Sequence, residues 1–179
     1  MWFTSPVNNV IGRAALKVPA VTGESPAAGS GINQTFTFQF SHPQGYQNLA
    51  VVNVLINNSL DARNACYLAY VQSSSTLHLV DDAGDAGGPF AGQIALGGAG
   101  TIQNSQCAVN LISALGSGTT LTLTVNIAFQ AGFAGNKIAF AGGEHGLASG
   151  GCLAGAAGGS IGIDPRDGSN TGSGSGLNG

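Results

Sequence analysis

The sequence predicts an all-β domain built as an antiparallel β-sandwich, with a barrel as the alternative. Apolar residues recur with a period of two in several short segments, and turn formers separate these segments. No segment has the apolar spacing of an amphipathic helix. About seven segments of strand length at this spacing favour the sandwich.

The two clearest strands alternate over their whole length. In "INQTFTFQF" (residues 32–40), Phe36, Phe38 and Phe40 lie on one face, opposite threonine and glutamine. In "TTLTLTVNIAFQ" (residues 119–130), large apolar residues alternate with threonine and asparagine. Each strand should therefore bury one face against a core.

The remaining strands are shorter or less regular, and turn residues bound them. They are expected at "LAVVNVLIN" (49–57), at "ACYLAYVQ" (65–72) and "LHLV" (77–80) as a hairpin, at "TIQNSQCAVNLI" (101–112) and at "KIAFA" (137–141).

The chain divides into three parts by composition. Residues 1–31 contain Pro6, Pro19 and Pro26 and are expected to form an extended N-terminal arm. Residues 32–141 form the sandwich. Residues 142–179 are rich in Gly, Ala and Ser and have too little apolar area to order themselves, which predicts a linker or an assembly segment.

Charge is scarce along the whole chain. Asp, Glu, Lys and Arg make up 7% of the residues, against about 25% in an ordinary soluble domain. Five basic residues and a net charge of -3 exclude a nucleic-acid footprint, which needs clustered Lys and Arg. A surface with so little charge repulsion is expected to be coated or to assemble.

The N-terminal sequence is not a secretion signal. Pro6, Asn8, Asn9, Arg13 and Lys17 interrupt any apolar core of signal length. If the protein is exported, its signal is expected to have been removed or to lie outside this chain. No apolar run approaches the roughly 20 residues of a membrane helix, so no membrane span is expected.

The motifs "NACYLAY", "LVDDAG", "NSQC" and "FAGNK" follow "QTFTFQFSHPQGYQNLAVVNVLINNSLDARN" in this order. Over about residues 34–140 the pattern resembles an uncharacterised module that is repeated in large secreted proteins of acidobacteria and related bacteria. The resemblance implies an immunoglobulin-like or fibronectin-like β-sandwich and an extracellular or cell-surface location. It carries over no catalytic residue.

In an exported sandwich, Cys66 and Cys107 are placed to form a disulfide between predicted strands, and two buried free thiols are the alternative. Cys152 is left over in the glycine-rich tail. An unpaired cysteine in a secreted chain indicates an intermolecular bridge or a free thiol.

One weak metal pattern is present. Asp81, Asp82 and Asp85 offer the oxygen ligands that calcium accepts, although they lack the EF-hand spacing and an ordinary acidic turn explains them as well. His42, His78 and His145 have no metal-binding spacing and are expected to be isolated. No cofactor is otherwise predicted.

Glycans enter the predictions in two ways. If Cys66 and Tyr70 face inward, Tyr67 faces outward, and with Tyr46 in a turn it is a weak candidate for sugar stacking. Core and turn tyrosines are the alternative. The sequons at Asn33 and Asn57 are weak glycosylation candidates.

The sequence contains no nucleophile elbow, phosphate loop or dinucleotide fingerprint. We therefore expect a non-enzymatic structural or adhesive module that associates with copies of itself or with other extracellular components, as a fibre or surface array. A carbohydrate-binding module is the alternative. An enzyme would need a site assembled in space, with Asp81, Asp82 or His78 beside a serine.

Overall fold

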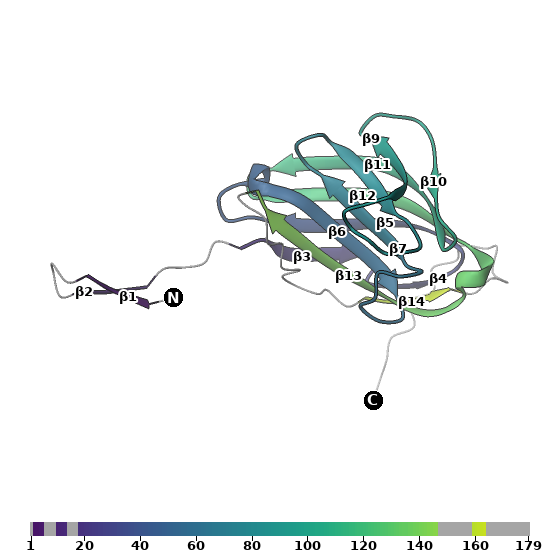
Figure 1. The fold of residues 1–179 in the computed structure, drawn as a ribbon, viewed down its shortest axis with the longest axis horizontal. Helices are drawn as coiled ribbons and strands as arrows, with labels where there is room; N and C mark the ends of the chain where they lie inside the picture. The colour runs from purple at the N-terminus through teal and green to yellow at the C-terminus, as the bar shows by residue number, and fades with distance from the viewer. Residues whose placement is uncertain (1, 6–9, 14–17, 147–158, 164–179) are drawn as a thin grey trace.

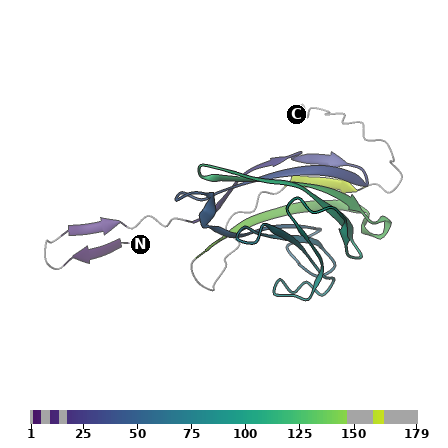
Figure 2. The ribbon, with the colours of Figure 1, turned by 90° about the horizontal axis from the view of Figure 1, so that it is seen from above.

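The computed structural model describes residues 2–5, 10–13, 18–146 and 159–163, with side chains described for residues 18–146. Two β-sheets pack face to face (Figures 1 and 2), which confirms the all-β sandwich. No helix in these residues has the length and apolar character needed to cross a membrane.

The first sheet has five antiparallel strands in the order β10 (Ile102–Gln103), β11 (Cys107–Ser117), β12 (Thr120–Phe129), β5 (Asn33–Ser41), β3 (Ala20–Ser25). The second has seven, in the order β4 (Ala28–Ser30), β14 (Gly159–Ile163), β13 (Gly135–His145), β6 (Leu49–Asn57), β7 (Cys66–Val71), β8 (Thr76–Val80), β9 (Phe90–Ala95). Among the described strands, only β4 and β14 pair in parallel. A separate ribbon pairs β1 (Trp2–Ser5) with β2 (Val10–Arg13), and two short 3-10 turns are η1 (Tyr46–Asn48) and η2 (Ala131–Phe133).

The alternation of β5 and β12 builds the core between the sheets. Phe36 and Phe38 pair in register with Val125 and Leu123, so their side chains share the inner face of the sheet. All four are buried. The predicted inner faces of both strands are therefore confirmed. From the other sheet the core receives Val52, Val54, Ile56, Leu68, Tyr70, Leu77 and Leu79.

One segment that was predicted to be a single strand forms two strands in the structure. The segment 101–112 was expected to be continuous, but β10 folds back on β11, with Ile102 opposite Val109. The turn forms because the side-chain oxygen of Asn104 accepts hydrogen bonds from the backbone N–H groups of Gln106 and Cys107, at 3.0 Å each. The predicted hairpin of β7 and β8 is confirmed, with Val71 opposite Thr76.

Both sheets extend beyond the predicted limits of the sandwich at residues 32 and 141. β3 pairs with β5, β13 continues through His145 beside β6, and β14 adds a strand beside β13. Gly143 lies within β13, where a Cβ atom would be 3.0 Å from the Cβ of Pro19. The glycine lets the N-terminal segment approach the sheet closely. Segments assigned to the arm and to the tail thus contribute strands.

Edge strand β3 points one carboxyl group inward. Glu24 pairs in register with Phe38, which faces the core, and one of its carboxyl oxygens is buried without a hydrogen-bond partner among the described residues. Burial raises the pKa of Glu24 from 4.5 to about 7. An inward carboxyl group on an edge strand also disfavours pairing with another sheet.

We expect Glu24 to make the protein less stable as the pH rises from 4.5 to 7. In this window the folded state holds the proton that the unfolded state has already lost, so unfolding becomes easier with increasing pH. Glu24→Gln should remove this dependence. At pH 8 it should also raise the free energy of unfolding, because the wild type then holds a partly buried carboxylate. The expected gain is only about 1 kcal/mol, because partial exposure to water screens that charge. Urea unfolding of both proteins at pH 5 and pH 8 checks this. Equal pH dependence in the two proteins would contradict it.

Candidate functional site

The disulfide predicted from the sequence joins the two sheets. Cys66 begins β7 in the seven-stranded sheet and Cys107 begins β11 in the five-stranded sheet, and their sulfur atoms are bonded at 2.02 Å. Both residues are fully buried. Cys66 is therefore a structural residue. Cys152 lies outside the described residues.

Asn104 connects three segments beside this disulfide. Its side-chain nitrogen donates to the backbone oxygens of Ala65 at 2.9 Å and of Val80 at 3.2 Å. Its oxygen accepts the two backbone bonds that form the turn before β11. The motifs "NACYLAY", "LVDDAG" and "NSQC" thus meet in one junction, and this junction is part of the scaffold.

The aspartates of "VDDAGDAGG" accept hydrogen bonds, two of them within their own turns. Asp81 accepts from the N–H of Ala83 at 3.1 Å, and Asp85 from that of Gly87 at 2.9 Å. Asp82 turns toward Ser105 and accepts from both its backbone N–H, at 3.3 Å, and its hydroxyl group. The three carboxylates thus have separate partners, and among the described residues no group of three His, Cys, Asp or Glu side chains is placed to hold a metal ion. Calcium binding at these aspartates stays a prediction.

The "FAGNK" motif also has a structural role. The ammonium group of Lys137 donates to the side-chain oxygen of Asn58 at 2.6 Å and lies 4.2 Å from the ring centroid of Phe133. Lys137 is buried, and burial lowers its pKa. The hydrogen bond to Asn58 connects the loop after β6 to β13, and the Phe133 ring adds a cation–π contact.

The prediction of isolated histidines is wrong for two of the three. The rings of His42 and His145 stack with centroids 4.7 Å apart and planes 10° apart. His42 follows β5 and His145 ends β13, so the pair lies between the two sheets. The backbone N–H of Gln44 donates to Nδ1 of His42 at 3.2 Å. His78 packs its ring on Phe90 at 4.5 Å between centroids.

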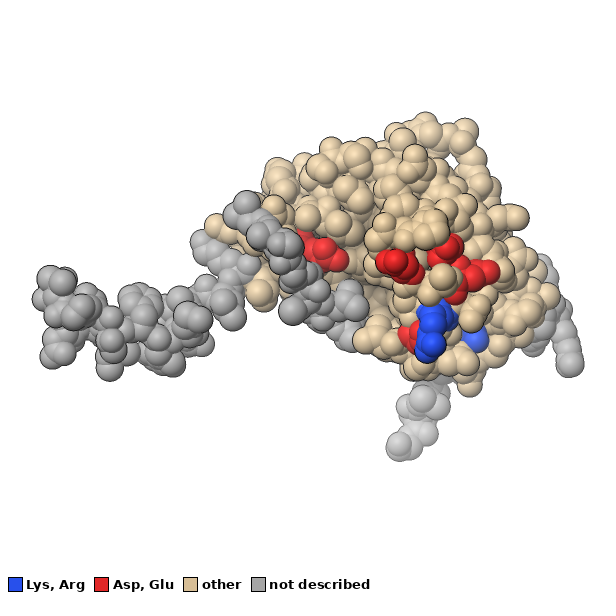
Figure 3. Space-filling view, viewed as in Figure 1, with Lys and Arg blue, Asp and Glu red and all other residues tan. Residues whose placement is uncertain are grey.

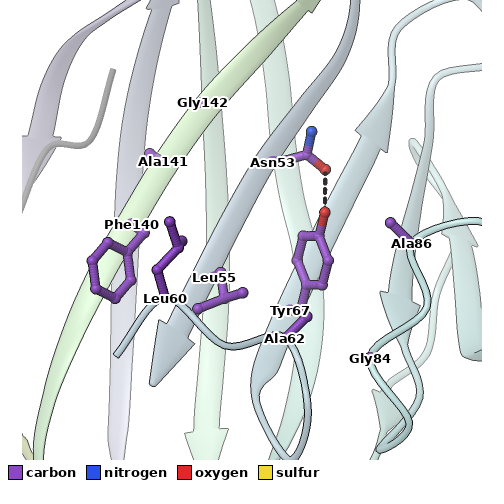
Figure 4. Close-up of a pocket in the computed structure, with 10 residues that line it drawn as sticks. All are labelled: Asn53, Leu55, Leu60, Ala62, Tyr67, Gly84, Ala86, Phe140, Ala141 and Gly142. Atoms are coloured by element: carbon purple, nitrogen blue, oxygen red, sulfur yellow. Dashed lines mark hydrogen bonds between the residues drawn. The ribbon is translucent and has the colours of Figure 1, made fainter. Parts of the chain in front are cut away.

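A pocket lies on the outer face of the seven-stranded sheet. Its floor comes from β6, β7 and β13, and the loops after β6 and β8 form its walls (Figure 4). Its volume is about 240 Å³. The lining is mostly apolar and comprises Asn53, Leu55, Leu60, Ala62, Tyr67, Gly84, Ala86, Phe140, Ala141 and Gly142.

Gly84 allows the two loops that form the pocket walls to lie in direct contact. It has a φ of +80°, and a Cβ atom there would lie 2.6 Å from the carbonyl carbon of Ala62 and 2.7 Å from the nitrogen of Arg63. Only glycine combines this backbone conformation with so close an approach. The loop after β8 therefore packs directly against the loop after β6.

Tyr67 lies on the outer face, as its strand period predicts, but the prediction that it is exposed is wrong. Only 7% of the residue is accessible, because Leu55, Ala65 and Val80 cluster around it. Its hydroxyl donates to the side-chain oxygen of Asn53 at 3.2 Å (Figure 4). Burial, and secondarily the negative charge of Glu144, raises the pKa of Tyr67.

Asn53 links this tyrosine to Glu144, since its amide nitrogen donates to a carboxylate oxygen of Glu144 at 3.1 Å. The three side chains give the pocket one polar end. Sequence reasoning did not single out Asn53, although it is the one polar residue inside the apolar run "AVVNVLI" of β6. That interruption was the available signal.

Tyr46 does not join Tyr67 in a platform. It lies in η1 and packs partly buried against the main core and against Gly116, where a Cβ atom would collide with its ring. Of the two sequon residues, Asn33 is exposed at the start of β5. Asn57 uses its amide nitrogen to donate to the backbone oxygen of Asp61 at 2.8 Å. Asn57 is therefore poorly placed for glycosylation.

Three of the acidic residues of the folded body lie beside this pocket. Residues 18–146 contain six acidic and two basic side chains, a net charge of -4. Figure 3 shows charged groups over the middle and lower part of the face where β6 and β13 lie in front, and none over its upper part. Asp61 and Asp85 are next to wall residues of the pocket, and Glu144 bonds to Asn53.

Comparisons with protein-family models, with curated proteins and with solved structures give no match to this chain.

Proposed function

We propose that the protein is a non-enzymatic extracellular module with an immunoglobulin-like sandwich that works structurally or adhesively by associating with copies of itself. One observation carries the proposal. Strands β5, β10, β11 and β12 contain no charged residue, so the broad outer face that they form is uncharged. Charge repulsion ordinarily keeps protein surfaces apart, and here it is missing over most of a sheet.

The side chains of this face also bond to one another. The hydroxyl groups of Thr37 and Thr124 lie 3.3 Å apart, and the amide of Asn126 donates to the hydroxyl of Thr35 at 3.1 Å. Polar groups that are already paired across strands lose less when water is removed from them. The face also exposes Ile112 and Leu115 on β11. These features favour contact with a second surface of the same kind.

The disulfide supports an extracellular location, because such bonds persist in oxidising compartments. The motif residues support a non-enzymatic role, because those with described contacts hold loops and strands together. No observation on the described residues favours glycan binding over association. Tyr67 is buried and Tyr46 packs on a different part of the sandwich.

Light scattering of the purified chain at micromolar concentration tests the proposal. We expect particles well above the 17.6 kDa of one chain. Leu115→Glu should reduce their mass, because it places a charge on the uncharged face, where Leu115 is 66% exposed. The fold should tolerate the change at this exposure. A monomer at all concentrations would overturn the proposal.

A further inference from the structure

The pocket on the seven-stranded sheet has the size of a side-chain site. Pockets for drug-sized ligands measure roughly 300–1,000 Å³, whereas this one has about 240 Å³ and a mostly apolar lining. Leu60 extends this lining outward and is 59% exposed. A single apolar side chain presented by another polypeptide fits these dimensions better than an oligosaccharide does.

The rim of the pocket carries uncompensated negative charge. Within residues 18–146 the structure has one ion pair, in which Arg63 lies 2.7 Å from Asp61. Lys137, the other basic residue of this part of the chain, donates to Asn58. Asp85 and Glu144 therefore have no cation at ion-pair distance among the described residues. A partner for this rim should combine apolar side chains with positive charge.

The N-terminal seventeen residues have this chemistry. They contain Arg13 and Lys17 and no acidic residue, together with the apolar Trp2, Phe3, Val10, Ile11 and Leu16. Strands β1 and β2 pair only with each other, and Figures 1 and 2 both place them away from the two sheets. A two-stranded ribbon alone is marginally stable at best in water, so it needs a surface on which to pack.

We propose that the β1–β2 segment of one copy docks on the acidic, pocketed face of a second copy, with an apolar side chain in the pocket and Arg13 and Lys17 opposite Asp85 and Glu144. The inference rests on the self-association proposed above and adds a second contact to that of the uncharged face. Because the two surfaces differ, the contact is head-to-tail and repeats into a ring or an open chain of copies.

Charge exchange in the full-length chain tests the docking, with association measured by analytical ultracentrifugation. Arg13→Glu and Asp85→Lys should each weaken association by about tenfold, and the double variant should recover most of the loss. Raising the salt concentration should weaken the wild-type contact. Recovery distinguishes a direct charge contact from a local disturbance of the turn at Asp85.

A second pair of variants separates this contact from the uncharged face. Leu60→Lys changes the pocket rim and Leu115→Glu the opposite sheet, and both positions are exposed enough for the fold to tolerate the charge. Near-UV circular dichroism checks that each variant is folded. Weaker association in Leu60→Lys supports the docking, because the lysine removes an apolar contact and repels Arg13 and Lys17. Association that is lost in Leu115→Glu but unchanged in Arg13→Glu and Leu60→Lys would overturn it while leaving self-association intact. A strictly monomeric wild type would overturn both.

Discussion

Removing the Cys66–Cys107 bond should lower the free energy of unfolding by about 4 kcal/mol, the value that loop-closure entropy gives for a closed loop of this length. The two cysteines are 41 residues apart, and the loop between them contains β7, β8, β9 and β10. The bond therefore restricts a large part of the unfolded chain. Since domains of this size are stable by about 5–15 kcal/mol, this loss is a large fraction of the total.

Urea unfolding of the double variant Cys66→Ala/Cys107→Ala against the wild type measures the effect. The wild type in strong reductant should lose a similar amount, whereas the double variant should not respond to reductant. Cys152 is the one cysteine left in the double variant, so a large further loss in reductant would show that an intermolecular disulfide through Cys152 contributes to stability. A difference near zero between wild type and variant would show that the bond stabilises the fold little.

The strands with strict alternation could be predicted from the sequence because one periodic pattern determines both their existence and their buried face. Phe36, Phe38 and Phe40 are buried as expected, and so is the apolar face of β12. The disulfide was predictable for a related reason, since both cysteines fall in segments predicted to be strands of one sandwich. In these places local sequence and tertiary packing agree.

The short strands β3, β4 and β14 were not predictable because their sequences contain no such pattern. β14 reads "GSIGI" and pairs with β13, and β4 reads "AGS". Neighbouring strands supply the hydrogen bonds that define them. Strand propensity here depends on what lies alongside.

The pocket was missed because loops cover a sheet face that would otherwise be exposed. The period of β7 places Tyr67 correctly on the outer face, but it cannot reveal that the loops after β6 and β8 close over it. The contact of Gly84 with Ala62 and the bond of Tyr67 to Asn53 join segments whose meeting is set by topology. Such long-range contacts are not encoded in local spacing.

Asn104→Ala should lower the free energy of unfolding by about 3 kcal/mol, because it removes four hydrogen bonds whose net contributions are about 1 kcal/mol each, with partial replacement by water. The loss leaves the backbone oxygens of Ala65 and Val80, both buried residues, without their donor. It also frees the turn that sets the start of β11 and the position of Cys107.

Asn126→Ala is the matched control. Asn126 lies on the outer face of β12, and its amide makes an exposed bond to Thr35, so we expect a change within about 0.5 kcal/mol. Asn104→Asp refines the test, since it retains the acceptor for Gln106 and Cys107 but directs an oxygen at two backbone carbonyl groups. At neutral pH it should destabilise the protein at least as much as alanine. If chemical unfolding gave Asn104→Ala a loss in free energy of unfolding as small as that of Asn126→Ala, the junction of the three motifs would not depend on the Asn104 side chain.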